Sequence, residues 1–267
     1  MLPSRDRDLV VITGGGTGIG RALVHHFSKA HRVVTCGRRL DRLKAAREAA
    51  PRPEAVTVVQ CDIGSAAGRD ALLRGVPSDQ KCLLLVQNAA IGDPAPLGEI
   101  DIEHFEESLR VNVVAPLALM QALLPALQGG GRVLHLGTSV AHRPQRGTAT
   151  YGITKMAFHR LYEQMNAEGA GVPVASLSPG MVDTEGVRDH VDKARALGLP
   201  HVHWFDKAFA EQATMPVDDL LRFVDHLMAL DGETFASREW SASEWRRAQS
   251  VRVDELTEPQ SSAGAEG

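Results

Sequence analysis

The stretch "VVITGGGTGIGRAL", Val10 to Leu23, joins a short apolar run to a helical pattern through a glycine-rich turn. The β-branched run is typical of a strand, and the apolar spacing after the glycines is typical of a helix. Glycine permits a tight turn and lets the backbone approach a phosphate closely, while the first turn of a helix offers unpaired N–H groups to an anion. The stretch therefore predicts a strand–turn–helix unit that binds a nucleotide.

The same alternation continues along most of the chain. Strands are expected at residues 9–13, 32–36, 55–60, 82–87, 132–137 and 172–177, and helices at 19–29, 40–49, 66–74, 102–127 and 151–168. Several of these strands are continuously apolar, as strands covered on both faces should be. This order predicts right-handed βαβ units, and hence one α/β domain, a Rossmann-type doubly wound parallel sheet with helices on both faces.

The C-terminal part departs from the alternation. Residues 185–215 have no clear place in it, and we expect them to form an insertion that covers the site as a substrate lid. A helix at 217–229 and a short strand around 234–240 would complete the sheet. The single domain is thus predicted at residues 1–250, followed by a polar, disordered tail at 251–267.

Composition narrows the class of protein. With 267 residues, of which 43% are hydrophobic, the chain suits one large domain. The net charge of -4 argues against a nucleic-acid partner, which would need a clustered basic face. We see no signal peptide and no membrane-spanning run, so a soluble, cytoplasmic protein without a membrane partner is expected.

Tyr151 and Lys155 in "YGITK" form the candidate catalytic pair. Residues four apart share one helix face, with about 6 Å between them along the axis. A nearby lysine cation would lower the pKa of the tyrosine from its usual value of about 10, so that the phenol can exchange a proton with a substrate oxygen. Such a pair can also be an ordinary surface feature, but its place after the fifth strand, at the ligand-binding edge of an open sheet, favours catalysis.

These motifs together resemble the short-chain dehydrogenase/reductase family, over roughly residues 8 to 240. The matching blocks are TGxxxGxG, "QNAA" (Gln87 to Ala90), "VNVVAP" with Asn112, YxxxK and "SPGMVDT". Ala90 stands where the family usually has glycine. The resemblance implies an NAD(P)-dependent enzyme that interconverts carbonyl and alcohol groups.

The resemblance also assigns roles to individual residues. Lys155 would hold the nicotinamide ribose, and Asn112 would shape its helix and anchor a water molecule in a proton relay. The residues expected at the cofactor are Gly14, Thr17, Gly18, Ile19, Gly20, Asp62, Ile63, Asn88, Ala89, Tyr151, Lys155, Pro179, Gly180, Val182 and Thr184.

The hydroxyl that would orient the substrate oxygen has two candidates. Counting thirteen residues back from Tyr151, the common family spacing, gives Thr138, whereas aligning "GTSVAH" on the family's strand end gives Ser139. Adjacent strand residues face opposite ways, so only one can point at the substrate. We prefer Ser139, because a loop can lose one residue at little cost. Either hydroxyl could instead cap the strand end.

The end of the second strand predicts the cofactor. Gly37 stands where NAD-preferring members carry an acid, and Arg38 and Arg39 follow it. A guanidinium can bind the 2′-phosphate of NADP(H), with Arg38 as the first choice and Arg39 in support. The glycine turn carries Thr17 where some NADPH-using members have a basic residue, so NAD(H) stays possible.

Substrate and partners are predicted more coarsely. His142, Met181 and Trp204 are placed at the substrate mouth. His201-x-His203 has no third ligand at a fitting distance in the sequence, and we predict no metal site. "SLSPGMVDTEG" and "GETFASREWSASE" look similar to the sepiapterin- and benzil-reductase-like branch, which reduces dicarbonyls. By resemblance we expect a homodimer or homotetramer formed through the helix at 102–127 and the helix that carries Tyr151.

The sequence thus predicts an NADPH-dependent reductase of a ketone or aldehyde, with Tyr151 as proton donor and Ser139 as the orienting hydroxyl. An NAD-dependent secondary-alcohol dehydrogenase is the first alternative. The second is a non-catalytic NADP-binding regulatory protein. Such relatives typically lose the tyrosine or the lysine, and both are present here.

Overall fold

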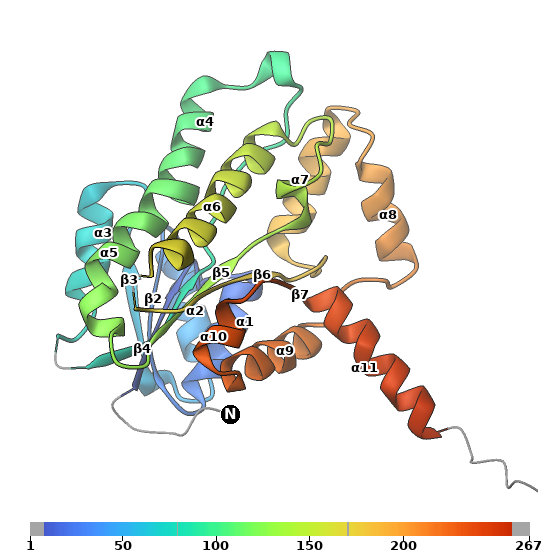
Figure 1. The fold of residues 1–267 in the computed structure, drawn as a ribbon. Helices are drawn as coiled ribbons and strands as arrows, with labels where there is room; N and C mark the ends of the chain where they lie inside the picture. Colours follow the sequence, from blue (N-terminus) through green and yellow to red (C-terminus); the bar gives the residue numbers. More distant parts are fainter. Residues whose placement is uncertain (1–7, 79, 170, 258–267) are drawn as a thin grey trace, which may run out of the picture.

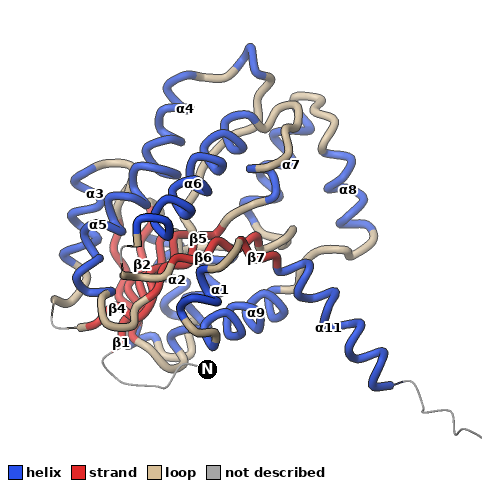
Figure 2. Tube along the Cα trace, in the orientation of Figure 1, coloured by secondary structure: helices blue, strands red, loops and turns tan. Residues whose placement is uncertain are grey.

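The protein is built on a seven-stranded parallel sheet between two layers of helices (Figures 1 and 2). The computed structural model describes residues 8–78, 80–169 and 171–257. The strands pair in the order β3-β2-β1-β4-β5-β6-β7, and each pair is parallel. They span β1 Asp8–Thr13, β2 Arg32–Gly37, β3 Val56–Gln60, β4 Lys81–Gln87, β5 Arg132–Leu136, β6 Val174–Ser178 and β7 Glu239–Ser241. This architecture confirms the predicted fold class.

The helices divide between the two faces of the sheet. Those of the alternating part are α1 Gly18–Ser28, α2 Leu40–Glu48, α3 Ala66–Arg74, α4 Ile102–Leu109, α5 Ala115–Leu127 and α6 Ala149–Glu168, and those that follow β6 are α7 Glu185–Ala196, α8 Val202–Ala210, α9 Val217–Ala229, α10 Gly232–Ala236 and α11 Ala242–Thr257. Side chains of α1 and α9 bury one face, and those of α3, α5 and α6 bury the other. Apolar side chains thus point from the strands into both layers, as the continuously apolar runs predicted.

The strand order reverses beside β1, and this sets where a ligand can bind. The chain runs from β1 outward to β2 and β3, and then crosses to β4 on the other side of β1. In open parallel sheets, such a reversal leaves a crevice at the carboxyl ends of the strands. The glycine turn after β1 lies at that crevice.

The expected helix at residues 102–127 is present, but a π-helical segment, Arg110–Val114, interrupts it. The whole helix Ile102–Leu127 is the one helix among the described residues that is long and apolar enough to cross a membrane. Its buried side chains, from Val111 to Leu127, pack on the sheet with β1, β4 and β5, so it serves here as a core helix. This apolar helix was not expected from the sequence, in which no membrane-spanning run was predicted.

The C-terminal part differs from its prediction in three places. Residues 185–215 hold the helices α7 and α8, joined by a short turn. The expected strand around 234–240 is mostly the helix α10, capped by Asp231, and β7 begins only at Glu239. The helix α11 runs on to Thr257, past the predicted end of the domain at residue 250. Residues 1–7 and 258–267 of the domain and tail predictions lie outside the described residues.

Candidate active site and cofactor site

The glycine turn between β1 and α1 has the geometry of a phosphate cradle. Gly14 and Gly18 adopt positive φ angles of 73° and 54°, which glycine reaches without strain. A Cβ on Gly20 would lie 2.1 Å from the carbonyl oxygen of Gly14, so only glycine lets α1 start this close to the strand. Thr17, the N-cap residue, makes no side-chain capping bond, and the first turn of α1 carries no acidic residue. The N–H groups there are free to bind an anion.

Asn88 and Ala89 hold this turn against the end of β4. The Asn88 amide donates to the carbonyl oxygens of Thr13 and Gly14 at 2.9 and 3.1 Å. The backbone N–H groups of Asn88 and Ala89 both donate to the Thr13 hydroxyl at 3.1 Å. The "NAA" block therefore fixes the shape of the cradle.

The other residues predicted at the cofactor follow strands β3 and β6. Asp62 accepts from the backbone N–H of Gly64 at 2.9 Å and shapes the turn before α3, and Ile63 beside it is buried.

After β6, Gly180 has a φ of 73°, Val182 is buried, and Thr184 caps α7 by accepting from Val187 N. Pro179 is partly buried in the same turn. A Cβ on Gly18 would lie 3.2 Å from Thr184, so the two turns meet over the glycine cradle.

Arg38 and Arg39 emerge from the end of β2, and each pairs with a carboxylate. Arg38 lies 3.1 Å from Glu107 on α4, and Arg39 lies 3.0 Å from Glu185 on α7. Arg42, on the first turn of α2, also approaches Glu185 at 3.5 Å. All three guanidinium groups are exposed, so these ion pairs are weak and can exchange for another anion.

Tyr151 and Lys155 lie one turn apart on α6, as predicted. Lys155 is buried, donates to the carbonyl oxygen of Leu136 at the end of β5, and places its Nζ 4.1 Å from the centre of the Phe158 ring. Tyr151 packs against Gly92, where a Cβ would lie 3.0 Å from the tyrosine. The pair is thus positioned between the loops that follow β4 and β5.

The protonation states differ from the expectation that Lys155 lowers the pKa of Tyr151. Burial raises the pKa of Tyr151 to about 12, because the anionic phenolate would lose its hydration. Tyr151 still keeps part of its surface exposed. Burial lowers the pKa of Lys155 to about 7, against a smaller opposing effect of Glu239. At neutral pH Tyr151 is therefore a phenol that can donate a proton.

Asn112 lies in the π-helical segment and ties three elements together. Its side chain forms a two-point contact with the backbone of Ile91, donating to the carbonyl at 2.6 Å and accepting from the N–H at 2.9 Å. The same amide nitrogen lies 2.8 Å from the Thr154 hydroxyl on α6, beside Lys155. Asn112 thus fixes the catalytic helix against the loop after β4, and π segments of this kind are frequent at functional sites.

The two candidate hydroxyls lie beyond the strand, not on it. β5 ends at Leu136, and Thr138 caps a short 3-10 turn at Ser139–Ala141 by accepting from Val140 N at 3.3 Å. Because Thr138 and Ser139 lie outside the strand, the alternation of strand faces does not decide which of them points at the substrate. Ser139 is exposed, and its hydroxyl makes no hydrogen bond to the rest of the described chain.

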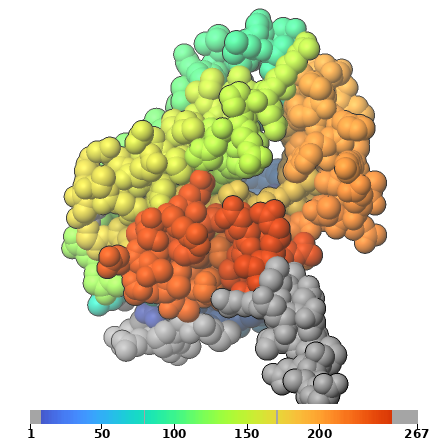
Figure 3. Space-filling view, turned by 45° about the vertical axis from the view of Figure 1, so that its right-hand side comes forward, coloured from blue at the N-terminus to red at the C-terminus, as the bar shows by residue number. Residues whose placement is uncertain are grey.

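The three predicted substrate residues come from three different segments of the chain, and each makes its own local contacts. His142 turns toward β7 and lies 2.8 Å from Glu239, while Trp204 on α8 is 58% exposed and stacks edge-on with Phe205. The backbone carbonyl of Met181 accepts from Met215 N at 2.7 Å. Figure 3 shows the surface hollowed between the orange segment with α7 and α8 and the green-yellow segment with α6.

The helices α7 and α8 contact both ends of the site. Glu185 contacts the arginines after β2, and Lys193 lies 2.9 Å from Asp93 in the loop after β4. His201 bonds the Arg146 carbonyl in the loop before α6 at 3.1 Å, and also lies 3.1 Å from His190. His203, the other half of the motif, is exposed on α8.

Three residues near the Tyr151–Lys155 pair were not predicted from the sequence. Thr154 joins Asn112 to the catalytic helix, and its place inside "YGITK" was the available signal. Glu239 favours the cationic form of Lys155 from β7, 84 residues further along the chain. His135 on β5 is fully buried and stacks on Phe158 at 4.2 Å, and burial holds its pKa well below the usual range. No sequence pattern links these last two residues to Lys155.

Comparisons with known proteins agree with this geometry. The pattern of the short chain dehydrogenase family matches residues 8–195. Serine 3-dehydrogenase from Rhizobium radiobacter is 32% identical over 183 residues, which cover 66% of this chain and 72% of that enzyme. A solved short chain dehydrogenase/reductase family protein superposes with a TM-score of 0.70 at 26% identity, covering 88% of this chain and 94% of that one.

A further solved relative carries a nucleotide. Alcohol dehydrogenase from the archaeon Thermococcus sibiricus, complexed with 5-hydroxy-NADP, is 26% identical with a TM-score of 0.60, over 66% of this chain and 77% of that one. The chain belongs to the short-chain dehydrogenase/reductase family. It is an NAD(P)-dependent oxidoreductase of that family.

Proposed function

We propose that the protein is an NADPH-dependent carbonyl reductase that converts a ketone or aldehyde to an alcohol. The observation that carries the proposal is the pair on α6, in which partly buried Tyr151 lies one turn from buried Lys155 and its pKa is raised, so that it is a phenol at physiological pH. A reductase needs a proton donor at the oxygen that becomes the hydroxyl group, and a phenol of raised pKa is protonated in every enzyme molecule.

The chain's own residues would act in the following way. Ser139, exposed at the start of the turn after β5, donates a hydrogen bond to the carbonyl oxygen and orients it. NADPH, when bound at the glycine cradle, would supply the hydride for the carbonyl carbon. Tyr151 gives its phenolic proton to the oxygen, and the nearby Lys155 cation stabilises the phenolate that remains. Asn112 keeps α6 at a fixed distance from the loop after β4.

The residues present fit NADPH. The cradle of Gly14, Gly18 and the first turn of α1 can accept the pyrophosphate, and Arg38 can exchange Glu107 for the 2′-phosphate. Arg39 can likewise exchange its ion pair with Glu185 for the 2′-phosphate. The relative from Thermococcus sibiricus, complexed with an NADP derivative, supports this preference.

The substrate would lie between α6 and the lid formed by α7 and α8. We propose that His142, Met181 and Trp204 contact the substrate, since Trp204 offers an exposed aromatic surface. A dicarbonyl next to an aromatic or apolar group is therefore the substrate class that we propose to test first.

The direct test uses NADPH with a panel of aliphatic, aromatic and vicinal dicarbonyl substrates. Turnover should be observed with wild type, and Tyr151→Phe should lower kcat by about 10²–10⁴-fold while NADPH affinity, followed by cofactor fluorescence, stays unchanged. Full turnover by Tyr151→Phe would overturn the mechanism. NADPH binding without turnover on any carbonyl would instead favour a regulatory protein.

An NAD-dependent secondary-alcohol dehydrogenase is the second candidate. The glutamates paired with Arg38 and Arg39 favour it, because Glu107 and Glu185 place negative charge where a 2′-phosphate would lie. Equal dissociation constants for NADH and NADPH would support this candidate.

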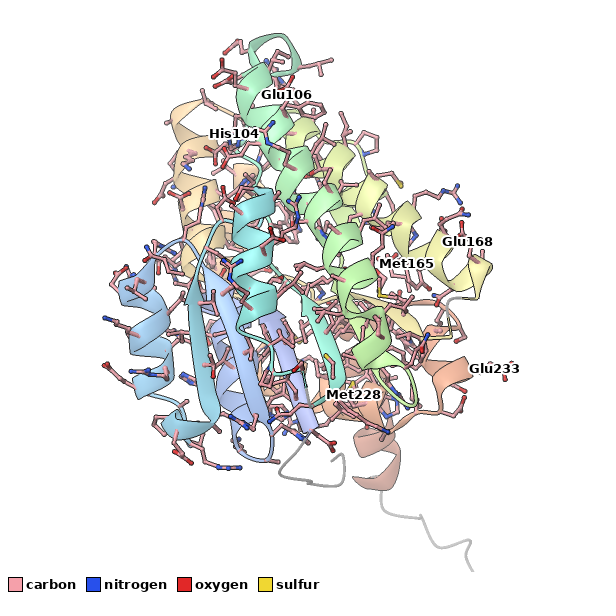
Figure 4. All side chains as sticks on the ribbon, turned by 90° about the vertical axis from the view of Figure 1, so that its left-hand side faces the viewer. His104, Glu106, Met165, Glu168, Met228 and Glu233 are labelled. Carbon is pink, nitrogen blue, oxygen red and sulfur yellow. The ribbon has the colours of Figure 1, made fainter. Side chains whose placement is uncertain are left out.

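We propose further that the protein is a cytoplasmic homodimer or homotetramer. Figure 4 shows α4 and α6 side by side, with His104 and Glu106 labelled on α4 and Met165 and Glu168 toward the far end of α6. Val114 in the π-helical segment, Leu117 on α5, and Ile153 and Met156 on α6 are 38–50% exposed. A second copy would bury them, and Leu117→Glu with Met156→Glu should reduce the mass measured by light scattering to that of one chain.

A further inference from the structure

A cluster of two histidines and one carboxylate lies between α6 and β7, apart from the catalytic hydroxyls. His142 follows the turn after β5, His159 is on α6 one turn beyond Lys155, and Glu239 is the first residue of β7. One ligand atom from each of the three lies within 4.8 Å of the other two. The three positions are up to 97 residues apart in the chain, so only the fold brings them together.

The distances suit a metal ion. His142 Nε2 lies 2.8 Å from one carboxylate oxygen of Glu239, and His159 Nδ1 lies 3.7 Å from the other. Ligand atoms at about 2.0–2.1 Å from a tetrahedral ion are about 3.4 Å apart, so a bound ion would replace the 2.8 Å hydrogen bond between His142 and Glu239 through shifts of about half an ångström. The two imidazole rings meet edge to face, with centroids 4.6 Å apart.

Two contacts point to a ligand more than to a simple ion pair. His159 Nδ1 is a buried atom without a hydrogen-bond partner in the described chain, and it faces the Glu239 carboxylate. On the other side of the ring, Nε2 lies 3.4 Å from Glu163. Metal-binding histidines commonly donate their second N–H to such a carboxylate, which fixes the ring. Ser176 similarly donates to Glu239 at 3.3 Å.

We propose that His142, His159 and Glu239 bind one divalent transition-metal ion such as Zn²⁺. Two imidazoles and a carboxylate favour zinc, cobalt or nickel over magnesium and calcium, which prefer oxygen ligands. The side chain of His142 is 37% exposed, which gives the ion a path from solvent and leaves one coordination position for water. His142 and Glu239 also adjoin the proposed reductase site, but metal binding requires neither NADPH nor turnover.

The test is a metal titration of the full-length protein after treatment with a chelator. Co²⁺ should bind at one equivalent per chain with visible ligand-field absorption, and Zn²⁺ should displace it and raise the Tm. His142→Ala and Glu239→Gln should each weaken the binding by at least about tenfold. His203→Ala, which removes an exposed histidine outside the cluster, is the matched control.

The outcomes are separable from those of the proposed function, because no step uses turnover or NADPH. His142 is exposed, so its replacement by alanine should leave the fold intact, and a circular dichroism spectrum checks this. Absence of stoichiometric Co²⁺ binding would overturn the proposal. Equal affinity in wild type and His142→Ala would overturn it as well.

Discussion

The catalytic face of α6 and the arginines after β2 lie at the same edge of the sheet, but they are held in different ways. Lys155 and Asn112 are buried and hydrogen-bonded to the backbone of neighbouring loops. Arg38 and Arg39 are exposed and bound only to carboxylates of α4 and α7. The first region is assembled before any ligand arrives, whereas the second has to exchange partners to bind a phosphate. On the proposed function, the core would therefore fix the catalytic groups, and exposed side chains would set the cofactor preference.

After Tyr151→Phe, the largest effect is expected at the hydroxyl beside the preassembled region. Ser139→Ala should lower kcat by about 10²–10³-fold, because the exposed hydroxyl is the group available to the substrate oxygen. Thr138→Ala should change kcat by less than about threefold, since its hydroxyl caps the turn. Steady-state kinetics with NADPH and one accepted carbonyl measure both. The reverse ranking would assign the role to Thr138.

The next effect tests the exposed region. Arg38→Ala should raise the Kd of NADPH by about 10–100-fold and leave that of NADH nearly unchanged, because only NADPH carries the 2′-phosphate. Isothermal titration with both cofactors measures this. Lys44→Ala, which removes one exposed charge from the neighbouring helix α2, is the control. A similar loss for NADH would show that Arg38 does not bind the 2′-phosphate.

The same contrast explains how far the sequence could predict the site. Tyr151 and Lys155 were predictable because i,i+4 geometry is local, and the sheet was predictable because its strands are continuously apolar. The rise in the pKa of Tyr151 in the cofactor-free chain could not be predicted, because it comes from burial by residues distant in the sequence, such as Gly92. The partners of Arg38 and Arg39 lie 69 and 146 residues away and could not be inferred.

A pH profile sharpens the description of the buried region. Because the folded pKa of Lys155 is about 7, the cation is lost as pH rises through neutrality. We expect kcat/KM for carbonyl reduction to be constant below that pH and to fall by about tenfold per unit above it, while Tyr151 stays protonated. Glu239→Gln should move the falling limb to lower pH, since Glu239 favours the cation. A flat profile from pH 6 to pH 9, a range of about three units, would contradict this.

The smallest effect concerns the carboxylates that hold the arginines. Glu107→Gln and Glu185→Gln remove charges that would repel a 2′-phosphate, and both ion pairs are exposed, so each contributes about 0–1 kcal/mol. We therefore expect each variant to tighten NADPH binding by about two- to fivefold, with the gain shrinking at high salt. Glu48→Gln, at the far end of α2, is the control and should change nothing. Weaker NADPH binding in either variant would mean that the replaced glutamate holds the arginine in place for the phosphate. The exposed region would then be preassembled, like the buried one.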